Sequence, residues 1–220
     1  MVDPDTDARR QAVVDLMAAL AYGELTAFER LATDSGLAPT IADKAELAQM
    51  ATKEFAHYQR LVARLAEMGV DAEEAMTPFV EPLNAFHDST SPSDWLEGLI
   101  KAYVGDNLAA DFYREVSTLL DDEDARTLVL DVLADTGHAS FAVDRVRAAV
   151  AADPAIAGRL ALWARRLVGE ALTQTQRVAV NRDSLSHLIG GAEDLAEVSR
   201  MLARITARHS ERMKALGLSG

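Results

Sequence analysis

The sequence contains no cysteine, and aromatic residues make up only 5% of it. The lack of cysteine excludes disulfides, thiolate metal sites and thiol nucleophiles, and it is typical of proteins in a reducing compartment. No run of about eighteen apolar residues is present, so we expect no membrane-spanning helix. The first residues are acidic and polar, unlike a secretory signal. These absences predict a cytoplasmic protein.

The residues that are abundant favour helices. Apolar residues make up 49% of the 220-residue chain, enough for a sizeable core. Ala, Leu, Glu and Arg are common, and they lose little side-chain entropy in a helix. Apolar residues recur every three or four positions, and strand-like alternation is absent. The sequence therefore predicts an all-α fold, with helices over about 6–35, 40–69, 91–121, 123–152, 154–181 and 193–216.

The links between these helices predict the topology. Short links join the first helix to the second and the third to the fourth, so each pair should form an antiparallel hairpin. The link from 69 to 91 is long and contains Pro78 and Pro82. Two hairpins joined by one long crossover form a ferritin-like four-helix bundle. The alternative is an ordinary helical bundle with an irregular middle loop. We expect the bundle to span 1–152 and a C-terminal helix pair, 153–220, to pack on it.

Two short motifs place an acid and a histidine three residues apart. The second predicted helix contains Glu54 and His57, and the fourth contains Asp135 and His138. Residues at this spacing share one face of a helix, so one metal ion can bind both side chains. A single motif of this kind arises often by chance. Two, each in the second helix of a hairpin, point to a built site.

The first helix of each hairpin offers a matching acid. Each hairpin has a Gly followed by an acid, which is Glu24 in the first and Asp106 in the second. From Glu24 to Glu54 is 30 residues, and from Asp106 to Asp135 is 29. This agreement indicates an internal duplication of a helical hairpin.

Counted from the hairpin turns, these side chains lie roughly 20–25 Å along their helices, at a common level. Buried charges at that level would be costly unless they bound metal. Four carboxylates and two imidazoles suit two iron ions, or Mn or Zn, better than Ca²⁺. A bundle that keeps buried polar pairs without metal is the alternative. The predicted metal ligands are Glu24, Glu54, His57, Asp106, Asp135 and His138.

With these markers, the stretch from Tyr22 to about Val150 resembles the ferritin-like di-iron superfamily. It is most similar to the bacterial tRNA hydroxylase-like family, which includes the enzyme that hydroxylates the isopentenyl group of 2-methylthio-isopentenyl adenosine in tRNA. The resemblance implies two irons bridged by solvent or oxo, and O₂ activation beside an apolar pocket. It also implies a hydroxylase that acts on a tRNA nucleoside; a small apolar substrate is an equal alternative.

The chain departs from the family pattern in its second half. Aspartate stands at 106 and 135, where the family usually has glutamate. The shorter arm would bring a metal nearer to the backbone, which leaves the occupancy of the second metal site open. Asp111 is an alternative ligand to Asp106. We otherwise expect Glu29 and Asp111 to be surface acids or to support the ligands.

Other functions remain open at this point. Iron handling or peroxide detoxification needs no organic substrate, and a metal-free helical interaction module needs no metal ligands. We expect His87 and His187 to lie in exposed loops and to take no part in the site.

Charge is unevenly distributed. Residues 1–154 carry 12 basic and 29 acidic side chains, a net charge of −17, whereas 155–220 carry 10 and 6, a net of +4. We expect the C-terminal helices to be a structural clamp or a homodimer surface. Their basic face could also contact phosphate, although a solvated face is the simplest interpretation. That face comprises Arg200, Arg204, Arg208 and Arg212.

Overall fold

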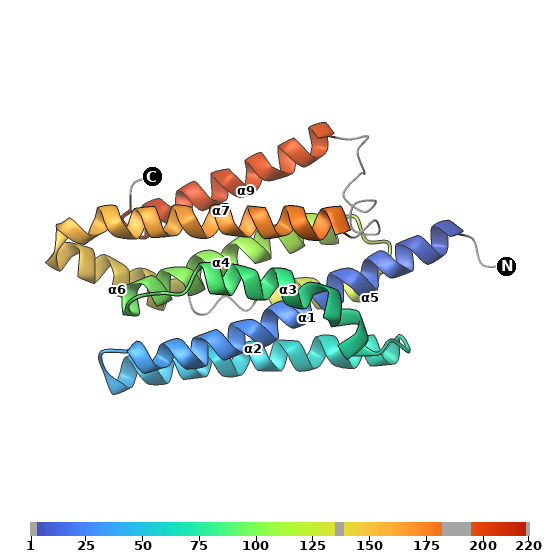
Figure 1. Ribbon diagram of the computed structural model, residues 1–220, viewed down its shortest axis with the longest axis horizontal. Helices are drawn as coiled ribbons and strands as arrows, with labels where there is room; N and C mark the ends of the chain where they lie inside the picture. Colours follow the sequence, from blue (N-terminus) through green and yellow to red (C-terminus); the bar gives the residue numbers. More distant parts are fainter. Residues whose placement is uncertain (1–3, 135–138, 182–194, 219–220) are drawn as a thin grey trace.

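The computed structural model describes residues 4–134, 139–181 and 195–218, and within these ranges the chain is helical and has no strand. This confirms the predicted all-α, ferritin-like helical bundle (Figure 1). None of the described helices is both long and apolar enough to cross a membrane. The long helices are α1 (Pro4–Asp34), α2 (Ile41–Glu67), α3 (Ala72–Ser89), α4 (Trp95–Ser117), α5 (Glu123–Ala134), α6 (Ala139–Ala152), α7 (Ala157–Asn181) and α9 (Leu195–Ala215).

The first hairpin consists of α1 and α2, which make extensive contact with each other and lie closest near the turn that joins them (Figure 1). A short 3-10 turn, Ser35–Leu37, leads out of α1. Thr40 then caps α2, because its hydroxyl oxygen accepts a hydrogen bond from the Asp43 N–H at 3.1 Å. The Asp43 carboxylate accepts from the Thr40 hydroxyl at 2.7 Å and from Arg145 Nε of α6 at 2.7 Å. The start of α2 is thereby tied to the second hairpin.

The long crossover between the hairpins is largely helical, which the sequence analysis did not predict. Residues 72–89 form α3, with Pro78 and Pro82 inside the helix. Each proline removes one backbone hydrogen bond, so sequence propensity argues against a helix here. Tertiary packing outweighs that loss: α3 lies against α1 and α7, and Phe79 is 1% exposed. Asp71 caps the helix by accepting from the Glu74 N–H at 2.9 Å.

The second hairpin consists of α4 followed by α5 and α6. The start of α4 lies later than predicted, because Asp94 rather than Ser91 is its cap and accepts from the Glu97 N–H at 2.9 Å. Both α5 and α6 pack on α4, where the sequence predicts one helix over 123–152. Residues 135–138, between α5 and α6, lie outside the described residues.

The C-terminal helices pack on the bundle through α3 and α4. Helix α7 lies against both, and α9 lies against α4. The basic side of α9 forms ion pairs with α4, which corrects its interpretation as a solvated face. Arg204 Nη2 lies 2.7 Å from Glu115, Arg208 contacts Glu115 at 3.1 Å, and Arg212 lies 2.5 Å from Asp111.

The buried apolar side chains form two clusters. One joins α1, α2, α3, α4 and α5 around side chains such as Met17, Leu61 and Phe79. The other joins α1, α2, α4, α6, α7 and α9 around side chains such as Leu99 and Leu160. The buried residues of α1, α2 and α4 belong partly to one cluster and partly to the other. The boundary between the clusters lies between Ala21 and Leu31 on α1, between Ala51 and Leu61 on α2, and between Val104 and Ala110 on α4. In the second half of the second hairpin it lies between Leu133 of α5 and Ala142 of α6.

Candidate functional site

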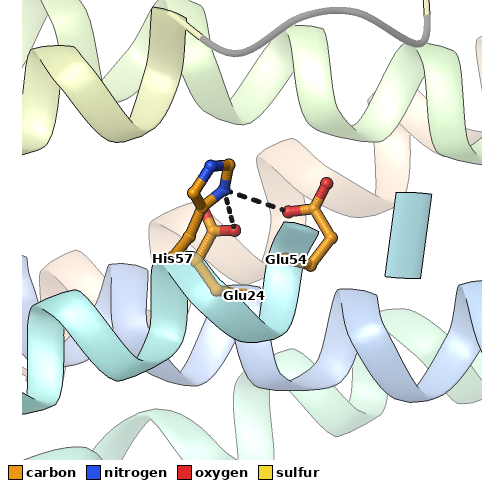
Figure 2. Close-up of side chains that lie close together, drawn as sticks. All are labelled: Glu24, Glu54 and His57. Atoms are coloured by element: carbon orange, nitrogen blue, oxygen red, sulfur yellow. Dashed lines mark hydrogen bonds and ion pairs between the residues drawn. The ribbon is translucent and has the colours of Figure 1, made fainter. Parts of the chain in front are cut away.

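Three of the predicted metal ligands meet between α1 and α2. Glu24 comes from α1, and Glu54 and His57 come from one face of α2 (Figure 2). His57 Nδ1 lies 3.2 Å from a Glu24 carboxylate oxygen and 3.8 Å from a Glu54 carboxylate oxygen. One ligand atom from each of the three residues lies within 4.8 Å of the other two. A single ion of the size of Fe²⁺, Mn²⁺ or Zn²⁺ can therefore contact all three after small side-chain adjustments.

Burial makes this group unusual electrostatically. Glu24, Glu54 and His57 are each less than one tenth exposed. Burial and the neighbouring Glu54 carboxylate raise the pKa of Glu24 well above its usual value. Hydrogen bonding to Glu24 and Glu54 raises the pKa of His57 to about 9, against the smaller opposing effect of burial. The two carboxylates thus need positive charge beside them, which a proton on His57 or a divalent ion supplies.

Asp106 of α4 belongs to the same electrostatic environment. Burial raises the pKa of its carboxyl group well above the usual value, with a further rise from Glu54 and an opposing effect of His57. Burial also raises the pKa of the Tyr113 hydroxyl on the same helix, and the Glu24 carboxylate adds a smaller rise. Asp106 therefore extends the acidic group from the first hairpin toward the second.

Asp135 and His138, the two other predicted ligands, lie outside the described residues. Their positions in the sequence are nevertheless informative. They fall between Leu133 and Ala142, where the chain passes from one apolar cluster to the other. The described ligands fall in the corresponding intervals of α1, α2 and α4. Glu24, Glu54, His57 and Asp106 therefore come from stretches where the chain passes from one apolar cluster to the other, and Asp135 and His138 stay predictions.

Asp111, the alternative ligand, is engaged elsewhere. Its side chain is only 2% exposed and lies within 4 Å of three arginines, namely Arg114, Arg208 and Arg212. Its counterpart in the first hairpin, Glu29, is exposed, as predicted. The structure therefore assigns Asp111 to the contact between α4 and α9 and leaves Asp106 as the acid of α4 beside Glu54.

A cavity of about 320 Å³ adjoins the acidic group. Glu24, Glu54, His57 and Asp106 line it together with many apolar side chains from α1, α3, α4 and α7. Such a cavity, mostly apolar with a few convergent polar groups, is typical of small-molecule sites.

The sequence did not single out three further polar residues of this cavity. His87 was expected in an exposed loop, but it lies half-buried on α3, and burial lowers its pKa to about 3. Lys101 is 6% exposed, and Arg30 is half-buried. Lys101 did carry a signal, because it interrupts an otherwise apolar run from Leu99 to Val104. His187 lies outside the described residues.

A family model described as the ferritin-like domain of actinomycetes matches residues 7–192, which is most of the chain. None of the curated proteins matches it. The ferritin-like fold often binds iron, and the carboxylate–histidine group fits a di-iron protein by the chemistry of its donors. The match covers both hairpins and extends beyond α7, so the chain belongs to the ferritin-like domain family of actinomycetes.

Proposed function

We propose that this protein is a di-iron, O₂-dependent hydroxylase similar to the tRNA hydroxylase-like family. The proposed ligands are those predicted from the sequence. One ion would contact Glu24, Glu54 and His57, and a second would use Asp106, Asp135 and His138. The observation that carries the proposal is the buried Glu24–Glu54–His57 group at the wall of an apolar cavity.

The metal pair, when bound, supplies O₂ activation, which no side chain of this chain provides. The chain's own residues would do the rest. Glu24, Glu54 and His57 hold negative charge and a nitrogen donor at one buried point. The apolar walls of the cavity keep water away from a reactive centre and orient an apolar group next to it. Because the buried charges are costly without a counter-ion, metal binding also stabilises the fold.

The cavity favours an organic substrate over iron handling alone. Storage or detoxification of small inorganic species needs no apolar cavity beside the ligands, whereas a hydroxylase does. A tRNA nucleoside is the substrate that the family resemblance implies. A small apolar substrate is an equal candidate, because the net charge of −13 opposes a wide contact with nucleic acid.

The test is hydroxylation by the iron-loaded protein under O₂ with a reductant. The substrates are tRNA that carries an isopentenyl adenosine nucleoside and a panel of small apolar molecules, and mass spectrometry detects the gain of one oxygen atom. We expect a product with the wild-type protein and with His209→Ala, and none with His57→Ala. Iron oxidation without any oxygenated product, together with cage-sized particles that hold ferric iron, would replace this proposal by iron handling.

A further inference from the structure

A second polar cluster lies in the same cavity, away from the proposed metal ligands. It comprises Arg30 and Asp34 of α1, His87 of α3 and Lys101 of α4, all of which line the cavity. We refer to these four residues as the Arg30–Lys101 cluster. None of them is a proposed metal ligand. Arg30 lies six residues beyond Glu24 on α1, which corresponds to about 9 Å along the helix axis.

The cluster contains two cationic side chains, Arg30 and Lys101, in a largely apolar cavity. Lys101 is 6% exposed, donates from Nζ to the Thr90 carbonyl at 2.8 Å, and lies 5.7 Å from the centre of the Phe86 ring. Burial lowers its pKa to about 8, so Lys101 is still mostly charged at pH 7. Asp34 is the acid of the cluster. With His87 neutral, Arg30, Lys101 and Asp34, the charged groups that line this part of the cavity, carry a net charge of +1; Asp88 also acts on Lys101, but it is exposed to solvent and does not line the cavity.

Two buried atoms of the cluster have no hydrogen-bond partner within the described part of the chain. They are Arg30 Nε and His87 Nδ1. The Thr26 hydroxyl donates to the Gly23 carbonyl at 2.9 Å, so it must accept from His87 Nε2, which lies 3.1 Å away. His87 is therefore protonated on Nε2, and its Nδ1 carries a lone pair. A buried polar atom without a partner is destabilising, so an acceptor that pairs with the Arg30 Nε–H and a donor that pairs with His87 Nδ1 are both favoured.

We propose that the Arg30–Lys101 cluster binds the carboxylate of an apolar carboxylic acid, whose tail runs through the cavity toward Glu24 and His57. A carboxylate carries one negative charge and so balances the cluster. It accepts from the unpaired Arg30 Nε–H and from Lys101, as guanidinium and ammonium groups prefer. A water molecule that enters with the carboxylate would donate to His87 Nδ1.

The walls of the cavity fit such a tail. The lining residues that lie between the cluster and the proposed ligands along their helices are small or apolar, namely Ala27 of α1 and Ala102 and Val104 of α4. An extended chain advances about 3.5 Å over three bonds, so about 9 Å corresponds to about eight bonds. Octanoate is therefore a suitable probe. That such an acid is the substrate depends on the proposed hydroxylase function, but its binding does not.

The test is calorimetric titration of the full-length, metal-free protein with octanoate, 1-octanol and octylammonium. We expect octanoate to bind at least about tenfold more tightly than 1-octanol, and octylammonium more weakly than either. Arg30→Gln should weaken octanoate binding about tenfold and leave 1-octanol binding unchanged. Lys101→Met should do the same, and Arg60→Gln, at an exposed position on α2, should change neither.

Equal binding of octanoate and 1-octanol, or no binding of octanoate, would overturn the proposal. So would an equal effect of Arg30→Gln and Arg60→Gln in proteins with the wild-type circular dichroism spectrum. A phosphodiester is the other common monoanion, and a dinucleoside monophosphate that binds where octanoate does not would assign the cluster to nucleic acid instead. Iron content measured for each variant separates this outcome from a failure of the metal site, because Arg30→Gln should leave it unchanged.

Discussion

The two hairpins have matching polar positions but different surroundings. In the first, Glu24, Glu54 and His57 contact one another in a buried group that is complete within α1 and α2. In the second, burial is the main cause of the raised pKa of Asp106, and Glu54 and His57 of the first hairpin have smaller, opposing effects on it. Duplicated spacing therefore does not produce equal environments, because each hairpin meets different neighbours.

The contrast is sharpest five residues after the first acid of each hairpin. Glu29 is exposed, whereas Asp111 is 2% exposed and surrounded by arginines, two of them from α9. Helix α9 packs on α4. The second hairpin is thus held from outside by charge pairs, and the first is held by its own close helix–helix packing.

The largest expected effect tests whether each hairpin holds its own ion. His57→Ala should weaken binding of one iron by at least about 100-fold, since loss of a ligand exceeds the 10–100-fold effect of losing a group that supports one. His138→Ala should remove the other ion. Equilibrium titration with Fe²⁺ under anaerobic conditions measures both, and His209→Ala is the control. If both variants keep the wild-type stoichiometry, the site assignment is wrong.

The next effect concerns the ion pairs between α4 and α9. Asp111→Ala leaves Arg212 beside a buried position without its partner, which should lower the free energy of unfolding by about 3 kcal/mol. Glu29 is the counterpart of Asp111 in the first hairpin, but it is exposed. Glu29→Ala should therefore change the free energy of unfolding by no more than about 0.5 kcal/mol. Urea unfolding followed by circular dichroism gives both values. Equal losses would show that the two positions do not differ as the structure describes.

A third effect comes from His87, which lies where the hairpins and the crossover meet. Its pKa is about 3 in the folded protein, below the usual 6.5, because it is buried. Between these values the unfolded chain binds a proton that the folded chain lacks, so the free energy of unfolding falls as the pH falls. The contribution is about 2 kcal/mol from pH 6.5 to pH 5. It should be missing in His87→Gln, and equal pH slopes for the two proteins would contradict it.

The smallest effect tests the short arm of the second hairpin. Asp106→Glu adds one methylene and gives the length usual in the tRNA hydroxylase-like family. Affinity for the second ion should rise about tenfold, the lower end of the changes seen when the support of a metal site is altered. Affinity for the first ion should stay within a factor of about two. A change in affinity for the first ion alone would mean that Asp106 is a ligand of the ion bound by Glu24, Glu54 and His57.

Sequence periodicity predicted most of the helices because their apolar faces are regular and their ends carry caps such as Thr40. It failed at α3, where Pro78 and Pro82 argue against a helix and only packing on α1 and α7 favours one.

The division into 1–152 and 153–220 stays a prediction, and so does a homodimer through the C-terminal helices. No local pattern shows that three arginines of α9 would meet Asp111 and Glu115, because that contact joins residues about 90–100 positions apart.

In the candidate site too, residues placed by helical spacing could be predicted, and residues brought together by tertiary packing could not. Glu24, Glu54 and His57 could be predicted because helical spacing and the duplication place them at one level. The Arg30–Lys101 cluster could not, because it is assembled from α1, α3 and α4, and the position of α3 was not predicted. Asp135 and His138 stay predictions as ligands.

Anaerobic titration of the full-length, metal-free protein with Fe²⁺ tests the central claim most directly. The claim is that the polar residues predicted as ligands, Glu24, Glu54, His57, Asp106, Asp135 and His138, form a two-metal site. We predict two iron ions per chain, with the tighter one lost in His57→Ala. If the wild-type protein binds no more iron than His57→Ala does, the claim is contradicted, and the buried Glu24–Glu54–His57 group is a metal-free element of the bundle.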